Sequence, residues 1–147
     1  MSKLFIIDDD KLITSNYADF FVGKGYIVAT SNTPFGVTNG IKLFLPDVVI
    51  ADINISGLSG KGLLNIIGDN RNFKVVLLAE DVRKDEMKAL AEKGLADDFF
   101  VKGEPLLQLA YKLSRLIGGV NANNPRRQPD GTGVSFSAGN ADNVCLT

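Results

Sequence analysis

The sequence predicts an α/β protein in which five parallel strands alternate with five helices, a doubly wound arrangement with helices on both faces of the sheet. Three observations lead to this fold class. Short apolar runs of strand length alternate with segments whose apolar residues recur at helical spacing. The runs at 47–52 and 75–79 are rich in Val, Ile and Leu, as in strands buried on both faces of a parallel sheet. Acidic residues or a lysine stand where most of these runs end.

The elements follow one another in a regular order along the chain. The expected strands cover residues 4–7, 26–29, 47–52, 75–79 and 99–101. The expected helices cover residues 12–21, 34–44, 63–67, 87–95 and 105–117. Pro46 disfavours a helix that continues into the third strand, and Gly118 and Gly119 end the last helix. Since parallel strands need crossover connections, the alternation places the helices on both faces of the sheet.

Composition excludes several classes of function. The 147 residues fit one domain, and 16 Lys and Arg against 17 Asp and Glu give no basic surface for direct nucleic-acid binding. The sequence has no His and one Cys, Cys145, which excludes His/Cys metal sites and Ser-His-Asp triads. A lone Cys favours a reducing compartment. There is no recognisable signal peptide, and no apolar run approaches the roughly 20 residues that span a membrane. We therefore expect a cytoplasmic protein without a membrane span.

The last part of the chain differs in composition from the rest. Residues 119–147 are crowded with Asn, Pro and Gly and contain few large apolar side chains. Such a segment buries too little surface to offset the entropy lost on ordering. The sequence thus predicts one folded domain over 1–118 and a flexible, low-complexity tail over 119–147.

Charged residues follow the first, third and fifth strands. Because the carboxyl ends of parallel strands meet at one edge of the sheet, Asp8, Asp9, Asp52 and Lys102 are expected to lie close together. Clustered carboxylates repel unless a cation holds them, and Mg²⁺ prefers oxygen ligands. Lys102 suits a phosphoryl oxygen, and the remaining carboxylate could accept a phosphoryl group. Taken singly, Asp52 could instead begin a turn, the Asp8 run could cap a helix and Lys102 could be a solvated strand end.

These residues also carry a family resemblance, which covers residues 3 to about 118. The chain resembles a two-component response-regulator receiver domain of the single-domain, CheY-like kind, through its segments 6–10, 46–52, 57–60, 96–99 and 101–102. The resemblance implies strand order 2-1-3-4-5. It makes Asp52 the phosphoacceptor and Lys102 a phosphate contact, and it assigns Mg²⁺ to Asp8, Asp9, Asp52 and the backbone carbonyl of Asn54. The expected phosphoryl donor is a histidine kinase or a phosphotransfer protein.

The chain departs from the family at the positions that report phosphorylation. Ala79 stands where the family usually has a switch Ser or Thr, and Phe99 occupies the switch-aromatic position without a phenolic hydroxyl. Gly103 replaces a Pro that is usually in a cis bond, which should loosen the placement of Lys102. Ser56 replaces another usual Pro, and the segment 94–98 is one residue longer than usual. The acceptor apparatus is thus expected to be intact and the readout altered.

Three functions remain open from the sequence. In the first, Asp52 is phosphorylated and the output is binding to a protein, through a face of helix 4, strand 5 and helix 5 that includes Lys84, Lys88, Phe99 and Tyr111 and could also form a homodimer. Such a chain is no enzyme beyond slow turnover of its acyl phosphate. In the second, a degenerate receiver binds its partner without phosphorylation. The third, a phosphohydrolase, is disfavoured because Asn54 stands where a general acid is needed.

Overall fold

The structure is a computed structural model that describes residues 2–55, 58–68, 72–118, 134–135 and 145–146. Ser56, Gly57 and most of the predicted tail lie outside the described residues, so the predictions that concern them are not tested. Among the described residues, no helix is long and apolar enough to cross a membrane.

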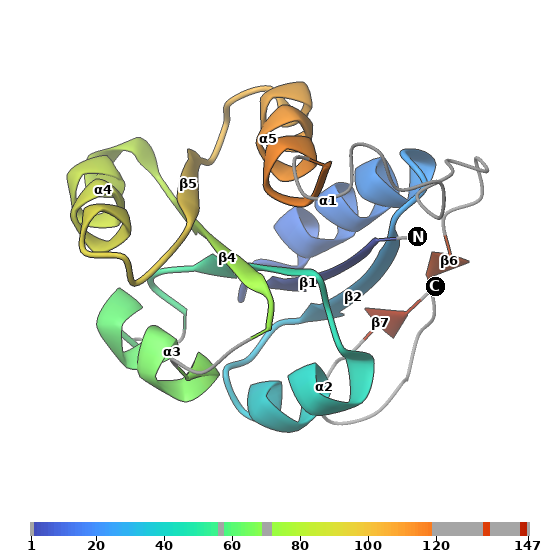
Figure 1. The fold of residues 1–147 in the computed structure, drawn as a ribbon, viewed down its shortest axis with the longest axis horizontal. Coiled ribbons are helices and arrows are strands. Elements are labelled where there is room, and N and C mark those ends of the chain that lie inside the picture. The colour runs from blue at the N-terminus through green and yellow to red at the C-terminus, as the bar shows by residue number, and fades with distance from the viewer. Residues whose placement is uncertain (1, 56–57, 69–71, 119–133, 136–144, 147) are drawn as a thin grey trace.

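Five parallel strands form the centre of the sheet, in the predicted order 2-1-3-4-5 (Figure 1). They are β1 (Lys3–Ile7), β2 (Ile27–Ser31), β3 (Val48–Asp52), β4 (Lys74–Ala79) and β5 (Asp98–Val101). The helices are α1 (Lys11–Gly23), α2 (Val37–Phe44), α3 (Gly60–Ile67), α4 (Lys84–Glu92) and α5 (Leu106–Leu113). A 3-10 turn, η1 (Asp81–Arg83), precedes α4, and a π-helical turn, η2 (Ser114–Gly118), follows α5.

The helices cover both faces of the sheet because successive strand residues point to opposite faces. Figure 1 shows α1 and α5 above the sheet and α2 and α3 below it. On the first face, alternate strand residues such as Ile6 and Ile50 pack against Phe21 of α1 and Leu109 of α5. On the second face, the intervening strand residues pack against α2, α3 and α4. Strand β3 is buried along its whole length, as its apolar sequence predicts.

Most helix boundaries lie one to four residues from the predicted ones, and the start of the second helix has a clear local cause. The second helix was expected from residue 34 but begins at Val37. The Phe35 N–H donates to Thr33 Oγ1 at 3.2 Å, which forms a side-chain turn around Pro34. Gly36 then adopts φ 79°, in the left-handed region that suits glycine, before the helix starts. The proline therefore belongs to the turn before the helix and not to its first turn.

Two short strands extend the sheet beyond the five expected ones. Strand β6 (Val134–Ser135) pairs parallel to β2, and β7 (Cys145–Leu146) pairs antiparallel to the same strand. Both belong to the segment predicted to be a flexible tail. Neither strand is predicted from the sequence, since two-residue pairings leave no periodic signal in a sequence.

Candidate functional site

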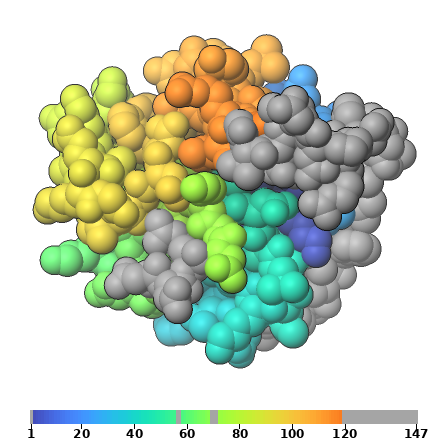
Figure 2. All heavy atoms as spheres, viewed as in Figure 1, coloured from blue at the N-terminus to red at the C-terminus, as the bar shows by residue number. Residues whose placement is uncertain are grey.

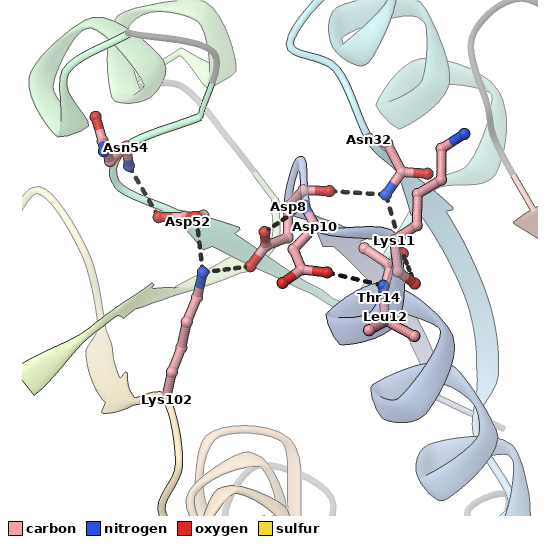
Figure 3. Close-up of polar contacts among 9 residues, drawn as sticks. All are labelled: Asp8, Asp10, Lys11, Leu12, Thr14, Asn32, Asp52, Asn54 and Lys102. Atoms are coloured by element: carbon pink, nitrogen blue, oxygen red, sulfur yellow. Dashed lines mark hydrogen bonds and ion pairs between the residues drawn. The ribbon is translucent and has the colours of Figure 1, made fainter.

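The carboxyl edge of the sheet brings together the charged residues that the sequence placed there. Asp8 follows β1, and Asp52 is the last residue of β3. Carboxylate oxygens of Asp8, Asp9 and Asp52 lie within 4.8 Å of one another. The side chain of Lys102, which follows β5, extends so that its ammonium lies between the carboxylates of Asp8 and Asp52 (Figure 3). Asp8, Asp9, Asp52 and Lys102 therefore form one group, which we call the acidic cluster.

Local structure separates the roles of the three consecutive aspartates. Asp10 is the N-cap of α1, and its Oδ1 accepts a hydrogen bond from the Leu12 N–H at 2.9 Å. Asp8 is fully buried and Asp9 is exposed, and both contribute an oxygen to the acidic cluster. Helix capping thus accounts for Asp10 alone, which leaves Asp8 and Asp9 for the cluster.

Asp52 is held by a donor on each oxygen. Its Oδ1 accepts from the backbone N–H of Asn54 at 2.9 Å, and its Oδ2 accepts from Lys102 Nζ at 2.8 Å. Asp52 is 6% exposed, so its carboxylate is nearly buried at the carboxyl edge of the sheet but is still accessible from solvent. Asn54 therefore contributes its N–H to this site, while the predicted role of its carbonyl as a metal ligand stays a prediction.

Asp8 experiences opposing electrostatic effects. Burial raises the pKa of Asp8 to about 6, and the nearby charge of Asp52 acts in the same direction. Lys102 and the Asp10 N–H, which donates to Asp8 Oδ1 at 2.9 Å, lower this pKa but do not cancel the effect of burial. Lys102 Nζ lies 2.7 Å from Asp8 Oδ2, and this contact is an ion pair without the alignment of a hydrogen bond.

Lys102 is fixed at both ends. Its backbone N–H donates to the carbonyl of Ala79 at 2.8 Å, and its ammonium contacts both buried carboxylates. Burial alone lowers the pKa of Lys102, but the bonds to Asp52 and Asp8 outweigh that effect and the pKa is raised. The following residue, Gly103, has φ 96°, which a proline cannot adopt. The turn after β5 is therefore built for glycine, and the described residues contain no cis peptide bond.

The acidic cluster fits a hard divalent cation. Three carboxylates face one ammonium, so the cluster carries excess negative charge whenever all three are ionised. Asp8 Oδ2 is buried, and no donor within the described residues gives it a well-aligned hydrogen bond. Such an oxygen gains from a metal ligand bond, and an all-oxygen donor set is what Mg²⁺ prefers. The residues present thus suit Mg²⁺ at this edge.

Asn32 is a part of the site that sequence reasoning missed. Its Nδ2 donates to the backbone carbonyl of Asp8 at 2.8 Å and to Thr14 Oγ1 at 2.9 Å. Thr14 Oγ1 in turn donates to the Lys11 carbonyl at 3.2 Å, so Asn32 ties the loop after β1 to the first turn of α1. The only signal in the sequence is a polar residue just after a strand, because its partners lie 18 and 24 residues away.

The two predicted switch positions, Ala79 and Phe99, carry uncharged side chains, unlike the acidic cluster. Ala79 is 1% exposed at the end of β4 and its side chain offers no hydrogen bond. Phe99 is half-buried in β5, where Lys112 Nζ lies 5.3 Å from the ring centroid and 3.1 Å from Asp98 Oδ1. Both positions therefore interact through packing and, at Phe99, through a cation–π contact.

Comparisons with known proteins agree with this geometry. The family model described as "Response regulator receiver domain" matches residues 4–113. A two-component response regulator from Clostridium difficile has 21% sequence identity and a TM-score of 0.74, over 82% of this chain and 99% of that chain. A receiver domain protein from Clostridium thermocellum has 23% identity and a TM-score of 0.73, over 83% and 98%.

A third similar structure is a chemotaxis response regulator, CheY4 of Vibrio cholerae, with 19% identity and a TM-score of 0.68, over 79% of this chain and 98% of that chain. No protein with a curated description matches the chain. At these identities the solved structures establish the fold, and the family model establishes the relationship. Because that model covers most of the chain and all four clustered residues, the chain belongs to the family of response-regulator receiver domains.

Proposed function

We propose that this chain is a phospho-accepting response regulator that receives a phosphoryl group on Asp52 from a histidine kinase or a phosphotransfer protein. The observation that carries the proposal is the setting of the Asp52 carboxylate. It lies at the end of a buried strand, bonded to Lys102 and within 4.8 Å of oxygens from Asp8 and Asp9. A nucleophile, a cation and a metal-binding oxygen set thus meet at one point of the sheet edge.

The chain's own residues supply most of the transfer chemistry. One Asp52 oxygen forms the bond to phosphorus, the phosphorus–nitrogen bond of the donor phosphohistidine breaks, and the imidazole nitrogen keeps the electron pair. The Asn54 N–H orients the carboxylate through Oδ1. The Lys102 ammonium, already 2.8 Å from Oδ2, is placed to neutralise charge on the incoming phosphoryl oxygens. Mg²⁺, held by Asp8, Asp9, Asp52 and the Asn54 carbonyl, would supply further neutralising charge.

The same residues support an acceptor and not a turnover enzyme. A turnover enzyme would need a general acid near Asp52. The first polar residue after Asp52 is Asn54, and its amide does not act as a general acid at neutral pH. Its backbone N–H is already committed to Asp52 Oδ1. Slow loss of the acyl phosphate is the only turnover that we propose.

The proposed output is binding to another protein through the face formed by α4, β5 and α5. Figure 2 shows these elements as an adjoining yellow-to-orange surface. Tyr111 and Leu107 are exposed on α5, and Lys84 and Lys88 are exposed on α4. A surface of exposed apolar side chains with charged residues beside them suits a partly apolar protein partner. The same face could serve a homodimer.

The test is phosphoryl transfer from a small acyl-phosphate or phosphoramidate donor with Mg²⁺, followed by intact-protein mass spectrometry. Wild type should gain the mass of one phosphoryl group, and Asp52→Asn should gain none. Asp19→Asn, at an exposed position on α1, is the matched control and should be labelled like wild type. An unlabelled wild type, or equal labelling of Asp52→Asn, would contradict the proposal.

The second candidate from the sequence is a degenerate receiver that binds its partner without phosphorylation, and it rests on one departure from the family pattern. Ala79 removes the hydroxyl that, by the family pattern, would bond the phosphoryl group. This candidate predicts that Asp52→Ala leaves partner binding unchanged in the cell. Loss of partner binding on that substitution would leave phosphorylation as the working function.

A further inference from the structure

A cavity lies at the amino edge of the sheet. Its volume is about 440 Å³, which is within the range of small-molecule sites. Helices α2 and α3, which cover the same face of the sheet (Figure 1), line it together with residues 46–47 and 72–73, which lead into β3 and β4. Because parallel strands begin at the edge opposite to the one where they end, this cavity is separate from the acidic cluster.

One part of the lining is apolar. Ile41 of α2 belongs to the hydrophobic core, and Ile67 and Phe73 pack against that core while they face the cavity. Leu45 lines the cavity as well and is 70% exposed. Its φ of 55° lies in the left-handed region, which leucine rarely adopts, and its N–H donates to the Ile41 carbonyl at 2.9 Å. The end of α2 therefore holds an apolar side chain in a defined position beside the cavity, where a ligand would cover it.

Two hydrogen-bond donors of the lining are available to a ligand. The Lys42 ammonium and the Asn72 side-chain amide are exposed, and neither has a hydrogen-bond or ion-pair partner among the residues that the structure describes. An ammonium and an amide N–H on one cavity suit an anionic oxygen group such as a carboxylate.

Asp47 is the acidic residue of the lining, and its position is fixed. Its N–H donates to the Lys3 carbonyl at 2.8 Å, and its own carbonyl accepts from the Lys74 N–H at 3.0 Å. Its Oδ2 accepts from the Lys3 N–H at 2.8 Å, while no donor from the described part of the chain bonds Oδ1. The second carboxylate oxygen can therefore accept a hydrogen bond from a ligand cation.

We infer that this cavity binds a free apolar α-amino acid. The lining offers one cationic and one anionic side chain, so a zwitterion makes both contacts and a ligand of single charge makes only one. The ligand's carboxylate accepts from Lys42 and Asn72, and its ammonium donates to Asp47. Its apolar side chain covers Ile67 and Phe73, which supplies the hydrophobic part of the binding. The inference goes beyond the proposed phosphoryl transfer and uses none of the residues of the acidic cluster.

Calorimetric titration of the full chain, with amide NMR to locate the bound molecule, tests the inference. The probes are L-phenylalanine, phenethylamine, which lacks the carboxylate, and phenylpropionate, which lacks the ammonium. We expect L-phenylalanine to bind at least ~10-fold more tightly than either analogue, because each analogue loses one charge-assisted contact. The amides that shift should include those of Ile41, Leu45 and Phe73.

Two variants assign the charges of the ligand to their partners. Lys42→Met should weaken binding of L-phenylalanine and phenylpropionate at least ~10-fold and leave phenethylamine unchanged. Asp47→Asn, which keeps an oxygen for the Lys3 N–H, should weaken L-phenylalanine and phenethylamine and leave phenylpropionate unchanged. Lys61→Met is the matched control, because Lys61 is exposed on α3 but does not line the cavity. It should bind all three probes like wild type.

Three results would overturn the inference. The first is that none of the probes produces heat or shifts an amide of the cavity lining. The second is that phenylpropionate binds as tightly as L-phenylalanine, which would make this a site for apolar carboxylates. The third is an affinity for L-phenylalanine that neither Lys42→Met nor Asp47→Asn changes. Because each variant should keep its wild-type affinity for one analogue, a variant that fails to fold is distinguished from one that has lost a single contact.

Discussion

The acidic cluster and the two switch positions belong to the same sheet but differ in chemistry. At the cluster, Lys102 contacts Asp8 and Asp52 at 2.7 and 2.8 Å, and each group depends on the charge of the others. At the switch positions, Ala79 is buried among apolar side chains, and Phe99 packs beneath the ammonium of Lys112. A backbone hydrogen bond from the Lys102 N–H to the Ala79 carbonyl joins the cluster to the first of these positions.

From this difference we expect the proposed acceptance of a phosphoryl group and its readout to be separable tasks in this fold. Desolvated charges interact strongly and specifically, so the cluster needs each of its members. Packing contacts have no such directional demand and respond only to changes of shape. We therefore expect substitutions in the cluster to have large effects on acceptance and stability, and substitutions at the switch positions to leave acceptance nearly intact.

Removal of the Lys102 charge should have the largest effect. Lys102→Met keeps the length of the side chain but withdraws the ammonium from Asp52 Oδ2. We expect the rate of labelling by an acyl-phosphate donor to fall by about 10²- to 10³-fold, since loss of one charge-stabilising donor costs about that much. Lys112→Met is the control, because Lys112 is also ion-paired to an aspartate but lies outside the cluster. Equal rates for wild type and Lys102→Met would contradict the proposed role.

Neutralising Asp8 should raise the free energy of unfolding at neutral pH. The folded pKa of Asp8, about 6, exceeds its ordinary value of 3.8, so the folded state binds the proton more tightly than the unfolded state. Asp8 therefore costs stability as the pH rises from about 4 to about 6, and the full cost applies above that window. We expect Asp8→Asn to gain about 2–3 kcal/mol near pH 8 and nothing near pH 4, by urea denaturation.

The control for this prediction is Asp19→Asn, which removes an exposed carboxylate from the solvent-facing side of α1. Its free energy of unfolding should change by no more than about 0.5 kcal/mol at either pH. A gain for Asp8→Asn that is the same at both pH values would show that charge at Asp8 is not the cause. Such a result would weaken the electrostatic account of the cluster.

Loss of the Asn32 amide should weaken the cluster indirectly. Asn32→Ala removes the donor to the Asp8 carbonyl and to Thr14 Oγ1. Because residues that orient metal ligands affect metal affinity by about 10- to 100-fold, we expect Mg²⁺ binding measured by calorimetry to weaken about tenfold. Asn39→Ala, exposed on α2, should bind Mg²⁺ like wild type. An Asn32→Ala protein with unaltered Mg²⁺ affinity would make Asn32 a purely structural residue.

A hydroxyl at position 79 should have the smallest effect on acceptance. Ala79→Ser adds a hydroxyl at the end of β4 without a new charge, so we expect the labelling rate to stay within about threefold of wild type. After phosphorylation, amides of η1 should exchange more slowly in the variant than in wild type, because the hydroxyl gives the phosphoryl group a bond to β4. A change of more than tenfold in labelling would show that acceptance and readout are not separable.

Much of the fold and of the cluster followed from the sequence because the signals are local. Apolar runs marked β1, β3 and β4, and the alternation of strands and helices fixed which edge of the sheet would carry Asp8, Asp52 and Lys102. The turn after β5 illustrates the limit. Replacement of the family's proline by Gly103 suggested a looser Lys102, but φ 96° at Gly103 and the bond from Lys102 to Ala79 describe a defined turn. Whether Lys102 is looser than in relatives stays a prediction.

The sequence by itself determined the order of elements, the parallel sheet and the residues at its carboxyl edge, since periodicity and strand-end chemistry are written in consecutive residues. Only the tertiary structure decided that Asn32 holds the loop of Asp8 and that burial raises the pKa of Asp8. It also decided that strands β6 and β7 pair with β2. These features depend on residues far apart in the chain, or on how deeply a group is buried, and neither property has a local signal.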